Sequence, residues 1–159
     1  MYKHILLPTD GSELAHKAVR QGLELAKALN AKATAVTVTE PWPVGGMEGG
    51  MMAPAPIAEY ESGVAQEANR VLSAVSDLAA EIGVGCTTVH VPNQYPAEGI
   101  VEQANARGAD LIVMASHGRR GLARLLLGSQ ATRVLAYSTV PVLICKEHEQ
   151  APPAYVEAA

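Results

Sequence analysis

The stretch LIVMASHGRRGLARLLLGSQAT, residues 111–132, combines three local patterns in a short piece of chain. Residues 111–114 form a continuous apolar run, as a strand buried on both faces of a parallel sheet requires. Residues 115–118 predict a turn of mostly small residues, where another group can approach the backbone closely. Gly128 and Ser129 then open a helical pattern, with Ser129 a suitable N-terminal residue. Together they predict an anion site, because free N–H groups and the helix dipole both favour a phosphate there.

The charge distribution supports this interpretation. The chain has a formal net charge of -4, yet no Asp or Glu occurs between Asp110 and Glu147. The acid-free interval contains a set of basic or titratable side chains: His117, Arg119, Arg120, Arg124 and Arg133. A basic segment in an acidic protein suits a small anionic ligand better than a long nucleic acid. The alternative is that these arginines form a solvated loop and helix face.

Length and composition are typical of a single aliphatic domain. The chain has 159 residues, of which 48% are hydrophobic and none is Phe. A chain of this length buries roughly 70% of its unfolded surface. No apolar run approaches the roughly 20 residues that a membrane helix needs, and the N-terminal stretch MYKHILLPTDGS lacks the features of a secretory signal. We therefore expect a cytoplasmic protein with no membrane partner.

The cysteines and histidines predict neither a disulfide nor a metal site. Cys86 and Cys145 each lie in an apolar run, so we expect buried, reduced thiols, with a disulfide or redox pair as the less favoured alternative. Five histidines are spread along the chain without the spacing of metal ligands. We expect no metal site built from protein ligands alone.

Strand and helix patterns alternate along the whole chain. The expected strands are residues 3–7, 32–39, 86–91, 110–115 and 140–145. The expected helices are residues 12–29, 57–82, 97–107 and 128–137. The first helix should bury one face, made of Ala15, Ala18, Val19, Gly22, Leu25, Ala26 and Leu29. This alternation predicts right-handed βαβ units and an α/β fold with a parallel sheet.

Two segments do not fit the alternation. Residues 40–56 contain four prolines and four glycines, so no regular element is expected there. Such a long loop is either a flap over the ligand, with Trp42 or the methionines covering an apolar group, or a solvated insertion. Residues 148–159 should form a loosely ordered tail, which leaves residues 1–147 as the single domain.

Ser-His-Gly, followed after nine residues by Gly-Ser, resembles the nucleotide-binding signature of the universal stress protein family. That signature is Gly, two residues, Gly, nine residues, Gly, then Ser or Thr. Gly118, Gly128 and Ser129 occupy the later positions, whereas Ala115 occupies that of the first glycine. The added methyl group at Ala115 could crowd a sugar or phosphate against the backbone.

The resemblance extends from ILLPTD at residues 5–10 to PVLI at residues 141–144. It implies a single open five-stranded parallel sheet with strand order 3-2-1-4-5 and helices on both faces, a Rossmann-like arrangement. This order puts strands one and four side by side where the strand order reverses, which is where such sheets bind ligands. The turns at residues 8–12 and 115–118 should then face one crevice.

The family's binding residues can be carried over position by position. The residues implied at the base and sugar end are Pro8, Thr9, Asp10, Val38, Met114 and Ala115. The residues implied at the phosphates are His117, Gly118, Gly128, Ser129 and Gln130. Val38 would offer backbone groups to adenine, and Asp10 would bind a ribose hydroxyl or help to hold Mg²⁺. A purely structural alternative is that Ser129 only caps its helix.

The resemblance therefore implies an ATP-binding stress-response protein that acts as a sensor or regulatory module. The P-loop motif is absent, and no nucleophile with a neighbouring base can be identified, so we expect binding without efficient turnover. One alternative is a family member without nucleotide binding that acts as a dimeric interaction protein. A weaker alternative is a slow ATPase or nucleotidyl transferase. The resemblance also implies a homodimer paired through the edge strand at residues 140–145 and protein partners of unknown identity.

Overall fold

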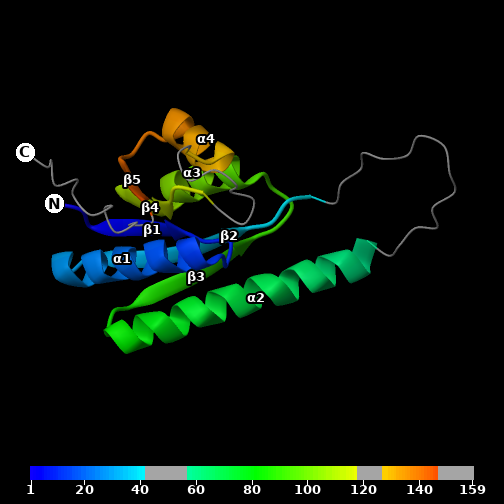
Figure 1. Cartoon of the computed structure of the whole chain (residues 1–159), viewed down its shortest axis with the longest axis horizontal. Helices are drawn as coiled ribbons and strands as arrows, with labels where there is room; N and C mark the ends of the chain where they lie inside the picture. The colour runs from blue at the N-terminus through cyan, green and yellow to red at the C-terminus, as the bar shows by residue number, and fades with distance from the viewer. Residues whose placement is uncertain (42–56, 118–126, 147–159) are drawn as a thin grey trace, which may run out of the picture.

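The computed structural model describes residues 1–41, 57–117 and 127–146, in which strands and helices alternate (Figure 1). The strands are β1 (His4–Pro8), β2 (Lys32–Val38), β3 (Cys86–Val91), β4 (Leu111–Ala115) and β5 (Val142–Cys145). The helices are α1 (Glu13–Leu29), α2 (Ile57–Ile82), α3 (Pro96–Arg107) and α4 (Ser129–Tyr137). Most of the expected flap and the whole expected tail, residues 42–56 and 148–159, lie outside the described residues, so both stay predictions.

The five strands form one open parallel sheet in the order β3-β2-β1-β4-β5, which confirms the expected topology. In the centre of the sheet, Ile5 of β1 pairs with Ala33 of β2 on one side and with Leu111 of β4 on the other. The strand order therefore reverses between β1 and β4. The chain leaves these two strands in opposite directions across the sheet, which opens a space at their carboxyl ends.

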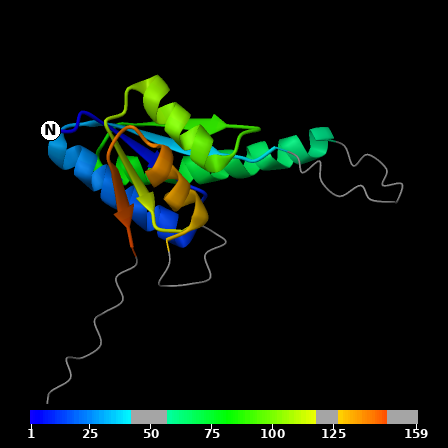
Figure 2. The ribbon, with the colours of Figure 1, turned by 90° about the horizontal axis from the view of Figure 1, so that it is seen from above.

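Helices cover both faces of the sheet, as expected (Figures 1 and 2). On β4, alternate side chains point to opposite faces. Leu111 and Val113 pack in the cluster that includes α1 and α2, whereas Ile112 and Met114 pack in the cluster that includes α3 and α4. Every residue of β4 is buried. This explains why its sequence is a continuous apolar run rather than an alternating one.

Helix α1 begins as its sequence predicts, because the Ser12 hydroxyl accepts a 3.2 Å hydrogen bond from the Ala15 amide. Its buried face differs in part from the expectation. Leu23 is buried, whereas Leu25 and Leu29 are only partly buried. The helix approaches the sheet closely at Gly22, where an added Cβ would lie 2.3 Å from a methyl group of Leu7. On the 3.6-residue period Leu25 falls at the edge of the stripe that faces the sheet, and Leu29 is the last residue of the helix, so both are only partly covered.

The last strand begins at Val142 rather than at residue 140. The Ser138 hydroxyl binds both backbone groups of Val140, accepting from its N–H at 3.2 Å and donating to its carbonyl at 2.7 Å. These bonds form a turn that holds the chain before β5. The other element boundaries differ from the expected ones by no more than about one residue, as is usual for element ends.

Both cysteines are free thiols, but only Cys145 is buried. Cys86 is partly exposed because it begins β3, which is one of the two edge strands of the sheet. Burial raises the pKa of each thiol, so both remain protonated and weakly nucleophilic near neutral pH. Across residues 1–41, 57–117 and 127–146, no helix has the length and apolar character needed to cross a membrane.

Candidate functional site

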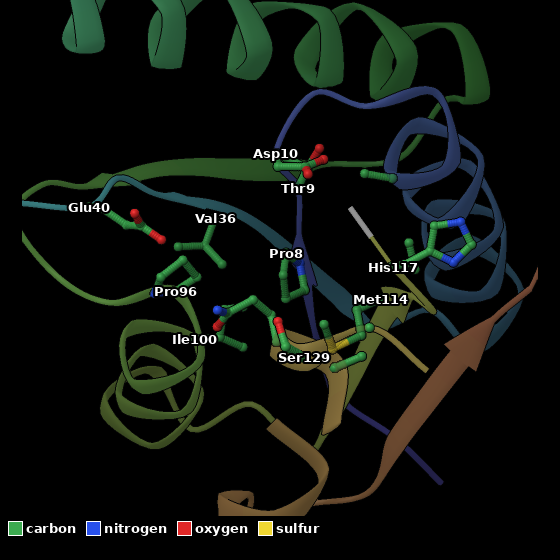
Figure 3. Close-up of a pocket in the computed structure, with 15 residues that line it drawn as sticks. Pro8, Thr9, Asp10, Val36, Glu40, Pro96, Ile100, Met114, His117 and Ser129 are labelled. Carbon is green, nitrogen blue, oxygen red and sulfur yellow. The ribbon is translucent and has the colours of Figure 1, made fainter. Parts of the chain in front are cut away.

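A cavity of about 310 Å³ lies at the carboxyl ends of β1 and β4 (Figure 3). Its volume falls within the range of roughly 300–1,000 Å³ that is usual for small-molecule sites. The lining residues come from five segments that are far apart in the sequence: the β1–α1 turn, the end of β2, the start of α3, the end of β4 and the start of α4. The cavity thus occupies the place where the strand order reverses.

The β1–α1 turn is held in one conformation by hydrogen bonds to β2 and within itself. The Thr9 amide donates to the Val36 carbonyl at 2.9 Å, and the Thr37 hydroxyl donates to the Thr9 carbonyl at 2.9 Å. The Asp10 carboxylate accepts the Ser12 amide at 2.9 Å, and Gly11 between them has φ of 78°. The left-handed conformation of Gly11 allows this tight turn. Thr9 and Asp10 therefore line a rigid wall.

The wall opposite this turn is the N-terminus of α4. Gly128 is the N-cap residue, with no side chain to occupy the helix end, and Ser129 is the first helical residue. The Thr132 amide makes the first intrahelical bond, to the Gly128 carbonyl at 2.9 Å. The amides of the first turn before it have no intrahelical partner, so they can bind an anion. The structure thus corrects one alternative: the Ser129 side chain is not the N-cap.

Side chains tie the N-termini of α3 and α4 together beside the cavity. The Gln130 side-chain oxygen accepts a 3.1 Å hydrogen bond from the Ala97 amide, in the first turn of α3. One turn further along, Arg133 of α4 forms an ion pair with Glu98 of α3. Tyr95, the N-cap of α3, contributes no side-chain cap. Gln130, which belongs to α4, therefore caps the N-terminus of α3 and keeps the N-termini of both helices directed at the cavity.

Ser116 and His117 follow β4 and are in contact with each other. The Ser116 hydroxyl lies 3.1 Å from Nδ1 of His117, and which of the two donates depends on the tautomer of the ring. The Ser116 amide donates to the Cys145 carbonyl at 2.9 Å, which fixes its backbone to β5. His117 lines the cavity, whereas Ser116 is only 6% exposed and is not part of the cavity wall.

Nine of the eleven residues expected at the site line this cavity. They are Pro8, Thr9, Asp10, Met114, Ala115, His117, Gly128, Ser129 and Gln130. Val38 instead lines a neighbouring hollow of about 520 Å³, between α2 and the end of β2. Gly118 lies outside the described residues, as do Arg119, Arg120 and Arg124.

The cavity wall also contains residues that sequence reasoning missed. They are Ala15, Val36, Glu40, Pro96, Ile100 and Ala131. Glu40 could have been predicted, because it lies two residues after the end of β2 and the ends of parallel strands meet at one edge of the sheet. Pro96 and Ile100 could not have been predicted, since only tertiary packing brings the start of α3 over this edge. No cluster of three or more metal-ligating side chains occurs in the part of the chain that the structure describes.

The universal stress protein family model matches residues 1–146, nearly the whole described fold. The chain belongs to the universal stress protein family. The universal stress protein MJ0531 of Methanocaldococcus jannaschii is 37% identical over 149 residues, which cover 92% of this chain and 84% of that protein. The family match spans both turns that form the cavity wall, and not the glycine signature alone.

Solved structures of the family share the fold. The structure of MJ0577, another universal stress protein of Methanocaldococcus jannaschii, has a TM-score of 0.79 at 29% identity and covers 94% of this chain and 99% of its own. The crystal structure of a universal stress protein in complex with cAMP has a TM-score of 0.70 at 27% identity, covering 92% of this chain and 99% of its own. The second relative therefore binds an adenine nucleotide on the same fold.

Proposed function

We propose that this universal stress protein binds an adenine nucleotide, ATP with or without Mg²⁺, and acts as a sensor or regulatory module in a stress response. The observation that carries the proposal is that the first turn of α4 opens into the cavity at the strand reversal. A phosphate beside Ser129 would meet N–H groups without intrahelical partners and the positive end of the helix dipole. The relative in complex with cAMP supports an adenine nucleotide as the ligand class.

The opposite end of the cavity is suited to a base and a sugar. Val36, Pro96 and Ile100 give it an apolar surface on which a purine can pack. Val38 lies next to this surface. The Thr39 amide donates a 2.9 Å hydrogen bond to the Val91 carbonyl of β3. Because successive residues of a strand direct their backbone groups to opposite sides, the N–H and C=O of Val38 point away from β3, into the space beyond the end of β1. We propose that they meet the edge of adenine.

The ribose and phosphates would then follow along the two rigid walls. We place the ribose at the turn formed by Thr9 and Asp10, where a carboxylate can accept a hydroxyl group or share a Mg²⁺ ion with the phosphates. Gly128 allows the backbone of the α4 N-terminus to lie against the end of β4, because a Cβ there would come within 3.0–3.1 Å of His117 and the Ser116 carbonyl oxygen. Gly118, the remaining signature glycine, stays a proposed phosphate contact.

Ala115, at the position of the first signature glycine, leaves room for this arrangement. It is only 7% exposed, and it belongs to the hydrophobic cluster on the α1 face of the sheet. Most of its surface is therefore covered by protein, and only a small part of it lines the cavity. This favours nucleotide binding over the alternative, a dimeric interaction protein that binds no nucleotide.

We propose binding without efficient turnover. A phosphoryl or nucleotidyl transfer would need a nucleophile or a base directed at the phosphate. The Ser116 hydroxyl is hydrogen-bonded to His117 but is buried and lies outside the cavity wall. Any hydrolysis should accordingly be slow.

We further propose a cytoplasmic homodimer that pairs through residues 140–145. β5 is an edge strand of the sheet, and Leu143 on it is 46% exposed. An apolar edge strand is prone to pair with another chain, and a two-fold axis would let two copies cover each other. Nucleotide-dependent choice of a protein partner would be the output of such a module.

Calorimetric titration with ATP, with and without Mg²⁺, tests the nucleotide site. The decisive variant is Ser129→Asp, because a carboxylate in the first turn of α4 stabilises the helix but repels a phosphate. Ser73→Asp, on the exposed face of α2 and outside the cavity wall, is the matched control. We expect micromolar or tighter binding to the unmodified protein and to Ser73→Asp, and at least tenfold weaker binding to Ser129→Asp. No binding by unmodified protein, once it is free of carried-over nucleotide, would favour the interaction-only alternative.

A further inference from the structure

Glu40 is the charged side chain at the apolar end of the cavity, away from His117. Figure 3 shows its carboxylate beside Val36 and Pro96, with His117 on the opposite side of the view. We propose that Glu40 selects the base: its carboxylate accepts a hydrogen bond from an exocyclic amino group, so the site takes adenine and rejects hypoxanthine and guanine. This inference rests on the proposed function and adds a specificity-determining residue to it.

The backbone that carries Glu40 is held firmly. The preceding residue, Thr39, donates its amide to the Val91 carbonyl at 2.9 Å and accepts the Gln94 amide on its own carbonyl at 3.1 Å. Its side chain also hydrogen-bonds to His90 at 2.8 Å. These three bonds anchor the end of β2 to β3 and to the turn before α3. The backbone at Glu40 therefore has a defined position at the base end of the cavity.

The carboxylate of Glu40 is available to a ligand. It is partly buried, and within residues 1–41, 57–117 and 127–146 no group makes a hydrogen bond or ion pair with it. The other carboxylate in the cavity wall, that of Asp10, is already engaged by the Ser12 amide in its own turn. A partly buried acceptor beside apolar side chains gains most from a ligand that brings a donor.

The chemistry of a carboxylate decides which bases it accepts. An ionised carboxylate accepts hydrogen bonds and donates none. Adenine carries a 6-amino donor, whereas hypoxanthine and guanine carry a 6-oxo acceptor at the same place. An oxo group facing Glu40 would repel the carboxylate and leave both acceptors desolvated. A site of this kind rejects the mismatched ligand more strongly than it favours the matched one.

Affinities for ATP and ITP, measured by calorimetry, test the proposal, because the two differ only at the base. Both carry the same phosphates, so the ratio of their dissociation constants cancels any general effect of changing the protein's charge. We expect the unmodified protein to bind ATP at least about tenfold more tightly than ITP. In Glu40→Gln the ratio should fall several-fold toward one, because an amide offers both a donor and an acceptor and leaves any selection to the peptide groups of Val38. Glu59→Gln, in the neighbouring hollow only, should keep the unmodified ratio.

The outcomes separate this inference from the function on which it rests. No binding of either nucleotide would overturn both. Equal binding of ATP and ITP by the unmodified protein would overturn base selection while the nucleotide site stands. An unchanged ratio in Glu40→Gln would assign the selection to the backbone of Val38 instead of Glu40. An effect of Glu40→Gln that appears with Mg²⁺ and vanishes in EDTA would mean that the carboxylate acts through a cation, which also overturns the proposal.

Discussion

The amide nitrogen of Gly128 donates a 2.8 Å hydrogen bond to the carbonyl oxygen of Ser116. This bond joins the start of α4 directly to the end of β4, and it brings the two backbones into contact. An ideal Cβ on Gly128 would lie 3.0 Å from the Cα and Cβ atoms of His117 and 3.1 Å from the Ser116 carbonyl oxygen. A side chain at this position would therefore be crowded by the protein itself, independently of any ligand.

Gly128→Ala should damage both the fold and the site, because the new methyl group would crowd His117 and the Ser116 carbonyl oxygen, and the backbone there would have to shift. We expect a loss of about 1–3 kcal/mol in the free energy of unfolding, measured by urea denaturation. Nucleotide affinity should fall at least about tenfold, since the first turn of α4 must shift. Gly63→Ala in α2 is the control: nothing lies within 4 Å of its added Cβ, so it should stabilise by about 0.5–1 kcal/mol. A Gly128→Ala protein with unmodified stability would contradict the packing argument.

Replacing Gln130 should separate its capping role from its position beside the phosphates. Gln130→Ala removes the acceptor for the Ala97 amide, which should cost about 1 kcal/mol of unfolding free energy. Gln130→Glu keeps an acceptor and adds negative charge at two helix N-termini, so its stability should equal or exceed that of the unmodified protein. Its affinity for ATP should nonetheless fall, because the carboxylate repels the phosphates. Unmodified ATP affinity in Gln130→Glu would place the phosphates elsewhere.

Asp110 should make the protein's stability depend on acid pH. Burial alone would raise the pKa of this carboxyl, but hydrogen bonds from the amides of His4, at 3.0 Å, and Lys3, at 2.8 Å, outweigh it and lower the pKa. A depressed pKa stabilises the fold above the unfolded value of about 3.9, and this contribution is lost as pH falls through the folded value.

The variant Asp110→Asn measures that contribution. At pH 7 it should be less stable than the unmodified protein by no more than about 1 kcal/mol, because water screens a largely exposed carboxylate. The difference should shrink as the pH falls below about 4, where Asp110 becomes protonated first in the unfolded chain and then, at lower pH, in the folded protein. Urea denaturation of both proteins at pH 7 and pH 3 gives the comparison. A difference that stays constant with pH would show that the carboxylate's charge plays no part.

Leu143→Lys should break the proposed dimer, because it places a charge on the exposed side of the edge strand β5. We expect a dimer mass for the unmodified protein in light scattering and a monomer, or aggregates, for the variant. Leu135→Lys is a matched control, since Leu135 is 44% exposed on α4 rather than on the strand. If Leu143→Lys keeps the dimer mass, the interface lies elsewhere.

Local patterns determined most of the architecture. Ser12 caps α1, the β-branched run of β2 is a strand, and the apolar run of β4 is buried on both faces. These features depend on contacts between neighbours in the chain and on the periods of 2 and 3.6 residues, which a sequence displays directly. The strand order came from the family resemblance, and the sheet topology confirms it.

Tertiary structure decided what the sequence left open at the site. Pro96 and Ile100 line the cavity only because α3 packs across the ends of β1 and β2, and no local pattern carries that information. Leu23 is buried and Leu25 only partly buried, on the part of α1 where Gly22 lies against Leu7. The sequence by itself determined the alternating elements, the glycine signature and the family to which the chain belongs. Only the packing of distant elements decided which side chains share one cavity, because their distances are set by the fold and not by their separation along the chain.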